Sequence, residues 1–356
     1  MDNTAQYDKR LPALDGVRGL AILLVLAYHY TQGGVAPWLQ QHARHSHSLE
    51  FGQAGVDLFF VLSGFLVTRL LTAHRGARNE GTGFFVRRVA RLLPLYTVLL
   101  AGFYIALALG GAETESPRWQ WLLGSPLPAW SYLSLTQNFA AMERAAWGAN
   151  WLAITWTLAV EVQAYLVLYT LVRLCPRPRL ALSLSALAML SVGLRFLFAN
   201  WWLSVVCIPF RFESFALGGL IALAAGTPAA IVALRDWHRW MPPTGALLAV
   251  GWIGLAYRGS AIGPLYFTWV ALSGAWLVLL AVVWPGHWLG VALRWPPLRY
   301  VGQISYGIYL LHQMTLGAVF ALARGGPPQL AVTGDWLYIG VALAGVRACR
   351  TFLPSV

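Results

Sequence analysis

Long apolar runs recur along the whole chain and restrict what it can fold into. Hydrophobic residues make up 58% of the 356 positions and charged residues only 11%, whereas a soluble domain carries about 25% charged residues. A membrane-spanning helix needs about 20 mostly apolar residues. We therefore expect an all-α, polytopic integral membrane protein with about ten transmembrane helices. The expected spans are 12–30, 54–73, 92–110, 154–173, 180–198, 203–225, 244–258, 265–284, 300–323 and 336–353.

The distribution of Lys and Arg predicts how these helices are oriented. Of the basic residues assigned to the connections, seventeen fall on one side of the membrane and six, Arg195 among them, on the other. Because cytoplasmic loops carry the excess of basic residues, both termini are expected in the cytoplasm. The N-terminal residues are too acidic and polar for a signal peptide. We expect residues 1–356 to form a single membrane domain.

The net charge of +12 is explained by the excess of basic residues in cytoplasmic loops. Basic residues in short loops account for it, so nucleic-acid binding is not expected. The three cysteines, Cys175, Cys207 and Cys349, are scattered along the chain. Their spacing predicts neither a disulfide framework nor a metal site, and no metal is expected.

Arg18 and His29 are the residues that point most directly to function. They lie eleven residues apart in the first expected span, close to three helical turns, so both face the same way and lie roughly 16 Å apart along the axis. Ionisable groups inside a span are costly and by default mark function. A cation toward the cytoplasm and a base near the outer face suggest a long polar substrate lying along the helix.

Asp57 lies at the outer end of the second expected span, at the level predicted for His29. A carboxylate beside an imidazole fixes its tautomer and stabilises the imidazolium, so Asp57 is a candidate partner for His29. The alternative is a structural Asp at a helix N-terminus, where the helix dipole favours it. The sequence leaves both interpretations open.

A cluster of arginines precedes the third span. Arg88 and Arg91 share one helical face, with Arg87 adjacent. Basic residues that snorkel at a membrane interface would give the same pattern. The functional interpretation is an anion clamp at the cytoplasmic mouth, because arginine suits phosphate. Such a clamp would fit a nucleotide-bearing acyl donor.

Other polar residues lie inside the expected spans. Glu161 is in the fourth span, and Arg211 and Glu213 are in the sixth. Each of the latter two is expected to have an intramembrane partner, which need not be the other. His312 in the ninth span is either a hydrogen-bonded structural residue or a contact to substrate.

The loop 111–153 carries several tryptophans. They form an aromatic belt at the interface, or they stack on a sugar or macrocycle. The five residues are Trp119, Trp121, Trp130, Trp147 and Trp151.

As a set, six strings resemble acyltransferase family 3 of membrane O-acyltransferases. In order they are Arg18-x10-His29, GVDLFFVLSGFL (55–66), RRVARLLPLY (87–96), WTLAVEVQAYL (156–166), RFESFALGG (211–219) and SYGIYLLH (305–312). The resemblance covers residues 10–325, and the second string is nearly the family pattern. There are two departures: Glu161 is followed by Val162 instead of belonging to paired glutamates, and the C-terminal GVRACRTFLPSV lacks the family's Glu.

This resemblance implies a function. Members acylate O-antigen, peptidoglycan, other surface polysaccharides, nodulation factors or macrolide sugars. The donor implied is cytoplasmic acyl-coenzyme A, with acetyl the expected group, and the acceptor is a hydroxyl of a carbohydrate, glycolipid or macrolide at the outer face of a bacterial inner membrane. A homo-oligomer is compatible with this. The residues implied are His29 as the catalytic histidine, Arg18 in the same motif, and Asp57, Arg88, Arg91 and Glu161 as further important positions.

Other classes compete with this interpretation. A transporter or flippase of a polar lipid or sugar would also place charges in spans, but it predicts broken helices near the midplane and no dependence on acyl-coenzyme A. A catalytically inactive partner subunit is disfavoured by the intact Arg18 and His29. Within an acyltransferase, transfer is either direct, with His29 as general base, or proceeds through an acyl-histidine.

Overall fold

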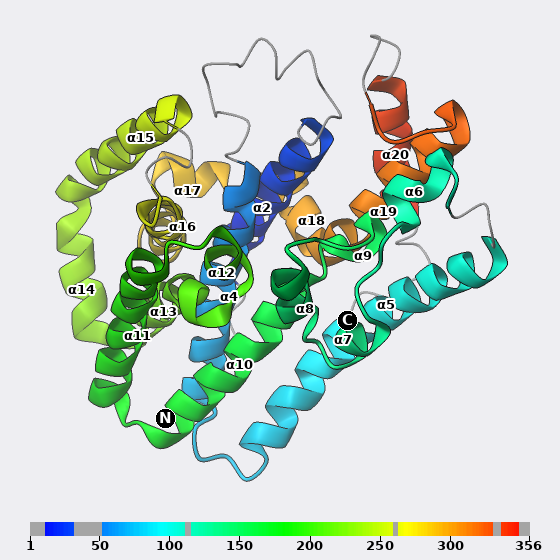
Figure 1. Ribbon diagram of the computed structural model, residues 1–356. Coiled ribbons are helices and arrows are strands. Elements are labelled where there is room, and N and C mark those ends of the chain that lie inside the picture. The colour runs from blue at the N-terminus through cyan, green and yellow to red at the C-terminus, as the bar shows by residue number, and fades with distance from the viewer. Residues whose placement is uncertain (1–10, 32–51, 111–114, 259–262, 330–335, 349–356) are drawn as a thin grey trace.

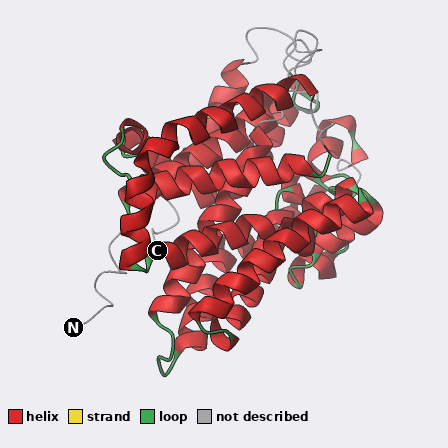
Figure 2. Cartoon of the chain, turned by 90° about the vertical axis from the view of Figure 1, so that its left-hand side faces the viewer, coloured by secondary structure: helices red, strands yellow, loops and turns green. Residues whose placement is uncertain are grey.

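The computed structural model describes residues 11–31, 52–110, 115–258, 263–329 and 336–348. These residues form helices joined by turns and loops, with no strand among them (Figure 2). Eight of the described helical segments are long and apolar enough to cross a membrane. The prediction of an all-α, polytopic membrane protein is confirmed.

The long helices carry most of the packing. They are α2 (Pro12–Thr31), α4 (Ala54–Ala73), α5 (Glu80–Gly110), α10 (Trp156–Leu174), α11 (Arg177–Phe198), α13 (Ile208–Ala225), α16 (Leu265–Val283) and α19 (Ser305–Arg324). Two of the spanning segments begin with a short helix, α9 (Asn150–Ala153) before α10 and α12 (Trp201–Val206) before α13.

Shorter helices join these elements. Between α5 and α9 lie α6 (Pro117–Leu123), α7 (Ala129–Leu133) and α8 (Gln137–Arg144), and after α13 come α14 (Pro228–Asp236), the 3₁₀ helix η3 (Trp237–Trp240) and α15 (Met241–Arg258). The remaining helices are α17 (Trp288–Ala292), α18 (Pro296–Gln303) and α20 (Trp336–Ala348).

Two of the ten expected spans are not among the eight. The expected span 244–258 lies in α15, and the expected span 336–353 starts with α20, whose predicted end lies outside the described residues. Helix α5 also differs from the expectation. It begins at Glu80 and continues through Pro94, so the arginine cluster belongs to the same helix as the third span.

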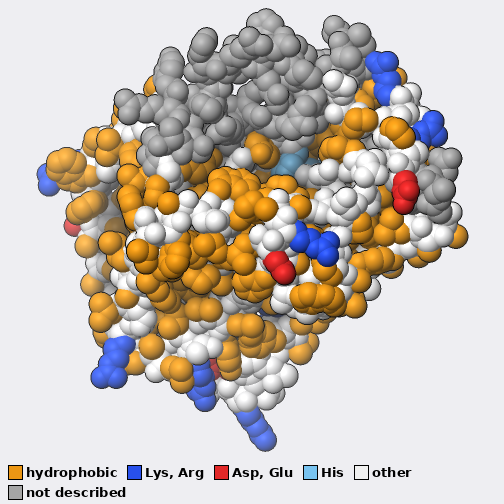
Figure 3. Space-filling view, in the orientation of Figure 1, with side chains coloured by type: hydrophobic (Ala, Val, Ile, Leu, Met, Phe, Trp, Pro, Cys, Tyr) orange, Lys and Arg blue, Asp and Glu red, His pale blue; other side chains and the backbone are white. Residues whose placement is uncertain are grey.

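Helices α2, α13 and α16 pack against α4 and form a group with it. In Figure 1, α5 lies on one side of this group and α11, α14 and α15 lie on the other. Hydrophobic side chains cover much of the face viewed in Figure 3, while Lys and Arg are few. An apolar outer surface with polar groups inside is what a bilayer solvent requires.

Glycines bring α4 and α13 into backbone contact. A Cβ on Gly64 would lie 2.1 Å from the carbonyl oxygen of Phe215, and a Cβ on Gly218 would lie 2.0 Å from that of Val61. Membrane helices associate through such small residues, because close backbone approach replaces the missing hydrophobic drive. The contact therefore sets which residues of α4 and α13 face each other.

Replacing one of these glycines should destabilise the fold. We expect Gly218→Ala to cost about 1–3 kcal/mol, because the added methyl group must push α4 and α13 apart. Gly193→Ala on α11 is the matched control, since a Cβ there meets no atom within 4 Å. Thermal unfolding in detergent should show a lower melting temperature for the first variant only. Equal melting temperatures would contradict the close contact.

Candidate active site

Two cavities inside the helix bundle meet at a common wall. The first, called the arginine cavity, is lined by Arg18, Arg88 and Arg91. The second, called the histidine cavity, is lined by His29 and opens among residues of α2, α4, α12, α13 and α19. Val56 and Tyr309 line both cavities. Arg18 and His29, both on α2, therefore line adjoining cavities.

The arginine cavity gathers three guanidinium groups from two helices. Arg18 comes from α2, and Arg88 and Arg91 come from successive turns of α5. The Arg88 guanidinium lies 5.2 Å from the ring centroid of Tyr165, within range of a cation–π interaction. Arg87 does not line either cavity and its side chain is exposed. Of the predicted arginine clamp, the structure thus brings together Arg88 and Arg91 without Arg87.

Glu161 supplies the acidic group of the arginine cavity. Its carboxylate accepts hydrogen bonds from the hydroxyl groups of Ser63 on α4 and Tyr165 on its own helix. Glu161 lines the cavity together with Arg18 and Arg91. The negative charge of Glu161 balances part of the positive charge of the arginines that line the same cavity. This lowers the free-energy cost of placing those arginines there.

The imidazole of His29 is arranged as a base. Its Nδ1 lies 2.9 Å from the backbone carbonyl oxygen of Val25. Because a carbonyl oxygen only accepts, Nδ1 must carry the hydrogen, and Nε2 is left with its lone pair. His29 lines the histidine cavity, so a proton donor in that cavity has access to the ring. This tautomer is the one that general-base chemistry at Nε2 requires.

His312 lies directly against His29. The two ring centroids are 4.8 Å apart, and the rings meet edge to face. The Nδ1 of His312 is 2.6 Å from the carbonyl oxygen of Tyr309, and the side chain is fully buried. His312 lines neither cavity. It therefore contacts the candidate base and not the space in which a substrate would lie, which favours its structural interpretation.

Asp57 has a different partner from the one predicted. Its Oδ1 is 3.0 Å from Nη2 of Arg211, and it accepts a hydrogen bond of 3.0 Å from the hydroxyl of Ser214. The described contacts place Arg211 and Ser214, and not His29, at the Asp57 carboxylate. The close packing of α4 on α13 places a buried cation beside Asp57, and a cation attracts a carboxylate more strongly than a neutral imidazole does. Asp57 still lines the histidine cavity.

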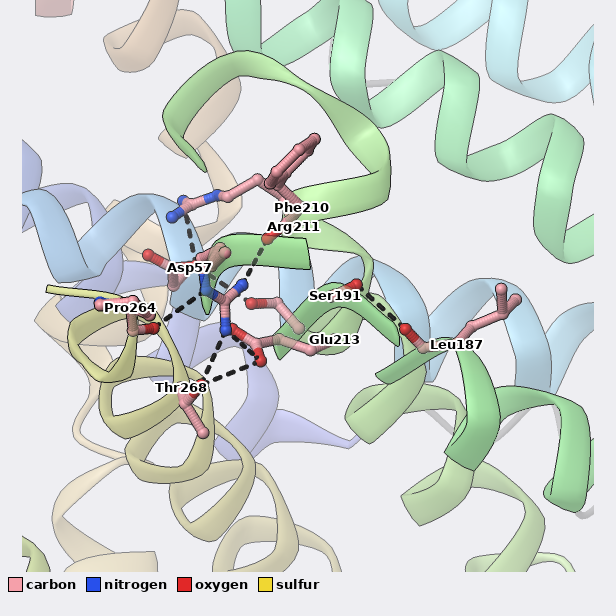
Figure 4. Close-up of polar contacts among 10 residues, drawn as sticks. Asp57, Leu187, Ser191, Phe210, Arg211, Glu213, Pro264 and Thr268 are labelled. Atoms are coloured by element: carbon pink, nitrogen blue, oxygen red, sulfur yellow. Dashed lines mark hydrogen bonds and ion pairs between the residues drawn. The ribbon is translucent and has the colours of Figure 1, made fainter. Parts of the chain in front are cut away.

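Arg211 and Glu213 each have a partner of their own, as predicted. Arg211 pairs with Asp57, whereas Glu213 lies 2.6 Å from Nη2 of Arg195 and accepts from the hydroxyl of Thr268 at 3.1 Å. Figure 4 shows Asp57 and Arg211 beside Glu213 and Thr268. Two carboxylates and two arginines thus form neighbouring buried pairs at the start of α13.

Arg195 is the buried charge that the sequence interpretation missed. It was assigned to a connection between spans, but it lies in the last turn of α11 and is fully buried. Its position inside the expected span 180–198 was the available signal. The partner on another helix could not be read from the chain.

Tryptophans form one wall of the histidine cavity. Trp121 and Trp147 of the predicted aromatic loop line it, together with Trp156 and Trp201. The Trp147 ring lies 5.8 Å from both Trp156 and Trp201 between centroids. Trp119, Trp130 and Trp151 do not line this cavity. Part of the aromatic loop therefore faces the space beside His29, where flat apolar rings can stack on a ligand.

Comparisons with known proteins identify relatives. A family profile described as "Acyltransferase domain" matches residues 11–349. Peptidoglycan O-acetyltransferase OatA of Listeria monocytogenes is 25% identical, over 88% of this chain and 50% of its own length. The putative peptidoglycan O-acetyltransferase YrhL of Bacillus subtilis is 24% identical, over 88% and 49%.

A relative of more similar length is acyltransferase MdmB of Streptomyces mycarofaciens. It is 26% identical, over 98% of this chain and 88% of its own length. The chain spans only about half the length of the two peptidoglycan O-acetyltransferases. No solved structure matches the chain.

Breaking the buried Arg195–Glu213 pair should destabilise the protein. Glu213→Gln leaves Arg195 charged and buried without its carboxylate, and such a loss costs about 3–5 kcal/mol. The double variant Arg195→Met/Glu213→Leu should recover much of that loss, because it removes both charges. Melting temperatures in detergent test this. If the double variant loses as much stability as the single variants Arg195→Met and Glu213→Leu lose together, the pair is not coupled.

Proposed function

Because this chain belongs to acyltransferase family 3, we propose that it is a membrane O-acyltransferase. It moves an acyl group, acetyl above all, from cytoplasmic acyl-coenzyme A to a hydroxyl of a saccharide or other surface or secreted acceptor. The observation that carries this proposal is the meeting of the arginine cavity and the histidine cavity at Val56 and Tyr309. The arginine cavity offers cations and the histidine cavity offers a base. The proposed thioester of acyl-coenzyme A would lie where the two cavities adjoin.

The arginine cavity suits the donor. Arg18, Arg88 and Arg91 converge on it, and guanidinium groups bind phosphate oxygens through paired, charge-assisted hydrogen bonds. In the orientation that the positive-inside rule favours, with both termini in the cytoplasm, this cavity faces the cytoplasmic pool of acyl-coenzyme A. The pantetheine arm then extends past Val56 and Tyr309 toward His29.

The histidine cavity suits the acceptor. Its tryptophan wall offers flat apolar faces for sugar rings. The names of the two peptidoglycan O-acetyltransferases among the relatives support a saccharide acceptor. The proposed acceptor hydroxyl lies between this wall and His29, on the outer side of a bacterial inner membrane.

His29 acts as general base in the proposed reaction. Its Nε2 takes the proton of the acceptor hydroxyl while the hydroxyl oxygen attacks the acyl carbonyl carbon. The carbon–sulfur bond then breaks, and the proton passes from His29 to the leaving thiolate. The hydrogen bond from Nδ1 to Val25 supports this role, because it keeps the lone pair on Nε2.

The direct test uses purified protein in detergent or liposomes. Incubation with labelled acetyl-coenzyme A and peptidoglycan fragments should yield labelled, base-labile O-acetyl groups on the saccharide. Movement of the saccharide across a liposome membrane without acetylation would instead indicate a transporter.

We expect His29→Ala to lower the acyl-transfer rate by about 10²–10⁴-fold, the usual contribution of a general base. His74→Ala is the matched control, because His74 forms the same type of bond to a carbonyl four residues earlier but lines neither cavity. Radiolabel transfer at saturating donor checks both variants. A His29→Ala variant with more than half of the wild-type rate would remove His29 from catalysis.

We expect Arg91→Ala to raise the KM for acetyl-coenzyme A, and Arg91→Lys to restore it only in part, because lysine lacks the fixed fork of donors. Arg87→Ala is the control, since both arginines are exposed residues of α5 but Arg87 lines neither cavity. Titration of acetyl-coenzyme A against the four proteins separates the cases. Full recovery in Arg91→Lys would indicate a snorkelling side chain.

A further inference from the structure

Arg211 is a buried cation with unused hydrogen-bond donors. Its side chain lines the histidine cavity with His29, although the residue is only 2% exposed. One nitrogen, Nη2, is bonded to Asp57. The other two, Nε and Nη1, are buried and have no hydrogen-bond partner among the residues that the structure describes.

The Arg211 guanidinium is held in one position. It lies 4.4 Å from the ring centroid of Phe267 and 5.5 Å from that of Phe60. The carboxylate of Asp57 fixes one end of the group, and the hydroxyl of Ser214 fixes that carboxylate. The planar group therefore cannot turn to find other acceptors, and its free N–H groups are preorganised.

Arg195 shows that this fold can give every nitrogen of a buried guanidinium a hydrogen-bond partner. Its Nε donates to the carbonyl oxygen of Pro264 at 3.0 Å, its Nη1 donates to that of Phe210, and its Nη2 contacts Glu213 and Thr268. Arg195 lines neither cavity. Leaving charged donors unpaired in a buried position is costly.

The difference between the two arginines is informative because each unsatisfied buried group in a native structure requires an explanation. The incompletely paired arginine is the one that lines a cavity. The free Nε and Nη1 donors therefore indicate a ligand that bears an oxygen with lone pairs and negative charge.

We propose that Arg211 binds the oxyanion that forms on the acyl carbonyl during transfer. This inference rests on the proposed function. When the acceptor oxygen bonds to the carbonyl carbon and His29 takes the proton, the carbonyl electron pair moves onto oxygen. The Nε–H and Nη1–H groups of Arg211 donate to that oxygen until the carbon–sulfur bond breaks and the electron pair returns. Asp57 is then a positioning residue that orients Arg211.

Kinetics of Arg211 variants test this role. With labelled acetyl-coenzyme A and peptidoglycan fragments, Arg211→Gln should lower kcat by about 10²–10³-fold, the usual loss for one oxyanion donor. The KM values for donor and acceptor should change little, because the oxyanion exists only in the transition state and intermediate. Arg211→Lys, which keeps the charge but not the fork, should recover part of kcat.

A second reaction separates oxyanion binding from acceptor binding. Hydrolysis of acetyl-coenzyme A without acceptor passes through the same oxyanion, so Arg211→Gln should lower the hydrolysis rate as well. If the variant raises only the KM for the acceptor and hydrolyses at the wild-type rate, Arg211 binds an anionic group of the acceptor and the proposal is wrong.

Controls keep loss of folding apart from loss of chemistry. Arg211→Gln/Asp57→Asn removes both charges of the pair and should fold even if Arg211→Gln does not, yet kcat should stay low. Glu213→Gln destabilises the neighbouring pair and should keep its kcat per folded molecule. Wild-type protein that neither transfers nor hydrolyses the acetyl group would overturn the proposed function and the oxyanion role with it. An active wild type with an equally active Arg211→Gln would overturn the oxyanion role alone.

Discussion

A carboxylate on α4 and a guanidinium on α13, both withdrawn from water, meet at the centre of this molecule. Neither Asp57 nor Arg211 can be buried alone at low cost, so the two helices must keep one register. Gly64 and Gly218 allow the backbone approach that this register needs. Residues of α4 line both cavities, Ser63 the arginine cavity and Val56 both. The geometry of the site therefore depends on this helix contact.

Features encoded by local sequence could be predicted from the chain. Hydrophobic length gave the all-α membrane fold, because each span must satisfy its backbone within itself. Helical periodicity placed Arg88 and Arg91 on one face, and both line the same cavity. Of the two spans not among the eight, 244–258 was the shortest one expected, and the predicted end of 336–353 lies outside the described residues.

Partners on different helices could not be predicted in the same way. The chain shows that Asp57 and Arg211 are buried charges, but 154 positions of sequence separate them and only packing of α4 on α13 brings them together. The same holds for the partner of Arg195, because Glu213 lies on another helix, α13. The partners in an ion pair inside a membrane domain depend on which helices are in contact. The hydropathy of a sequence does not indicate which helices are in contact.

The wall shared by the two cavities also bears on how the proposed membrane protein keeps ions from leaking across the membrane. Val56 and Tyr309 line both cavities, so in the proposed orientation they would stand between the cytoplasmic and the outer side of the membrane. The Tyr309 hydroxyl is occupied by Thr157 at 2.8 Å and by the carbonyl oxygen of Ile154 at 3.2 Å, so the wall offers few sites for water. Each charge that leaks across 100 mV dissipates about 2.3 kcal/mol. In the proposed reaction the acyl group must pass this wall without ions following it, so the passage can open only as far as it still excludes them.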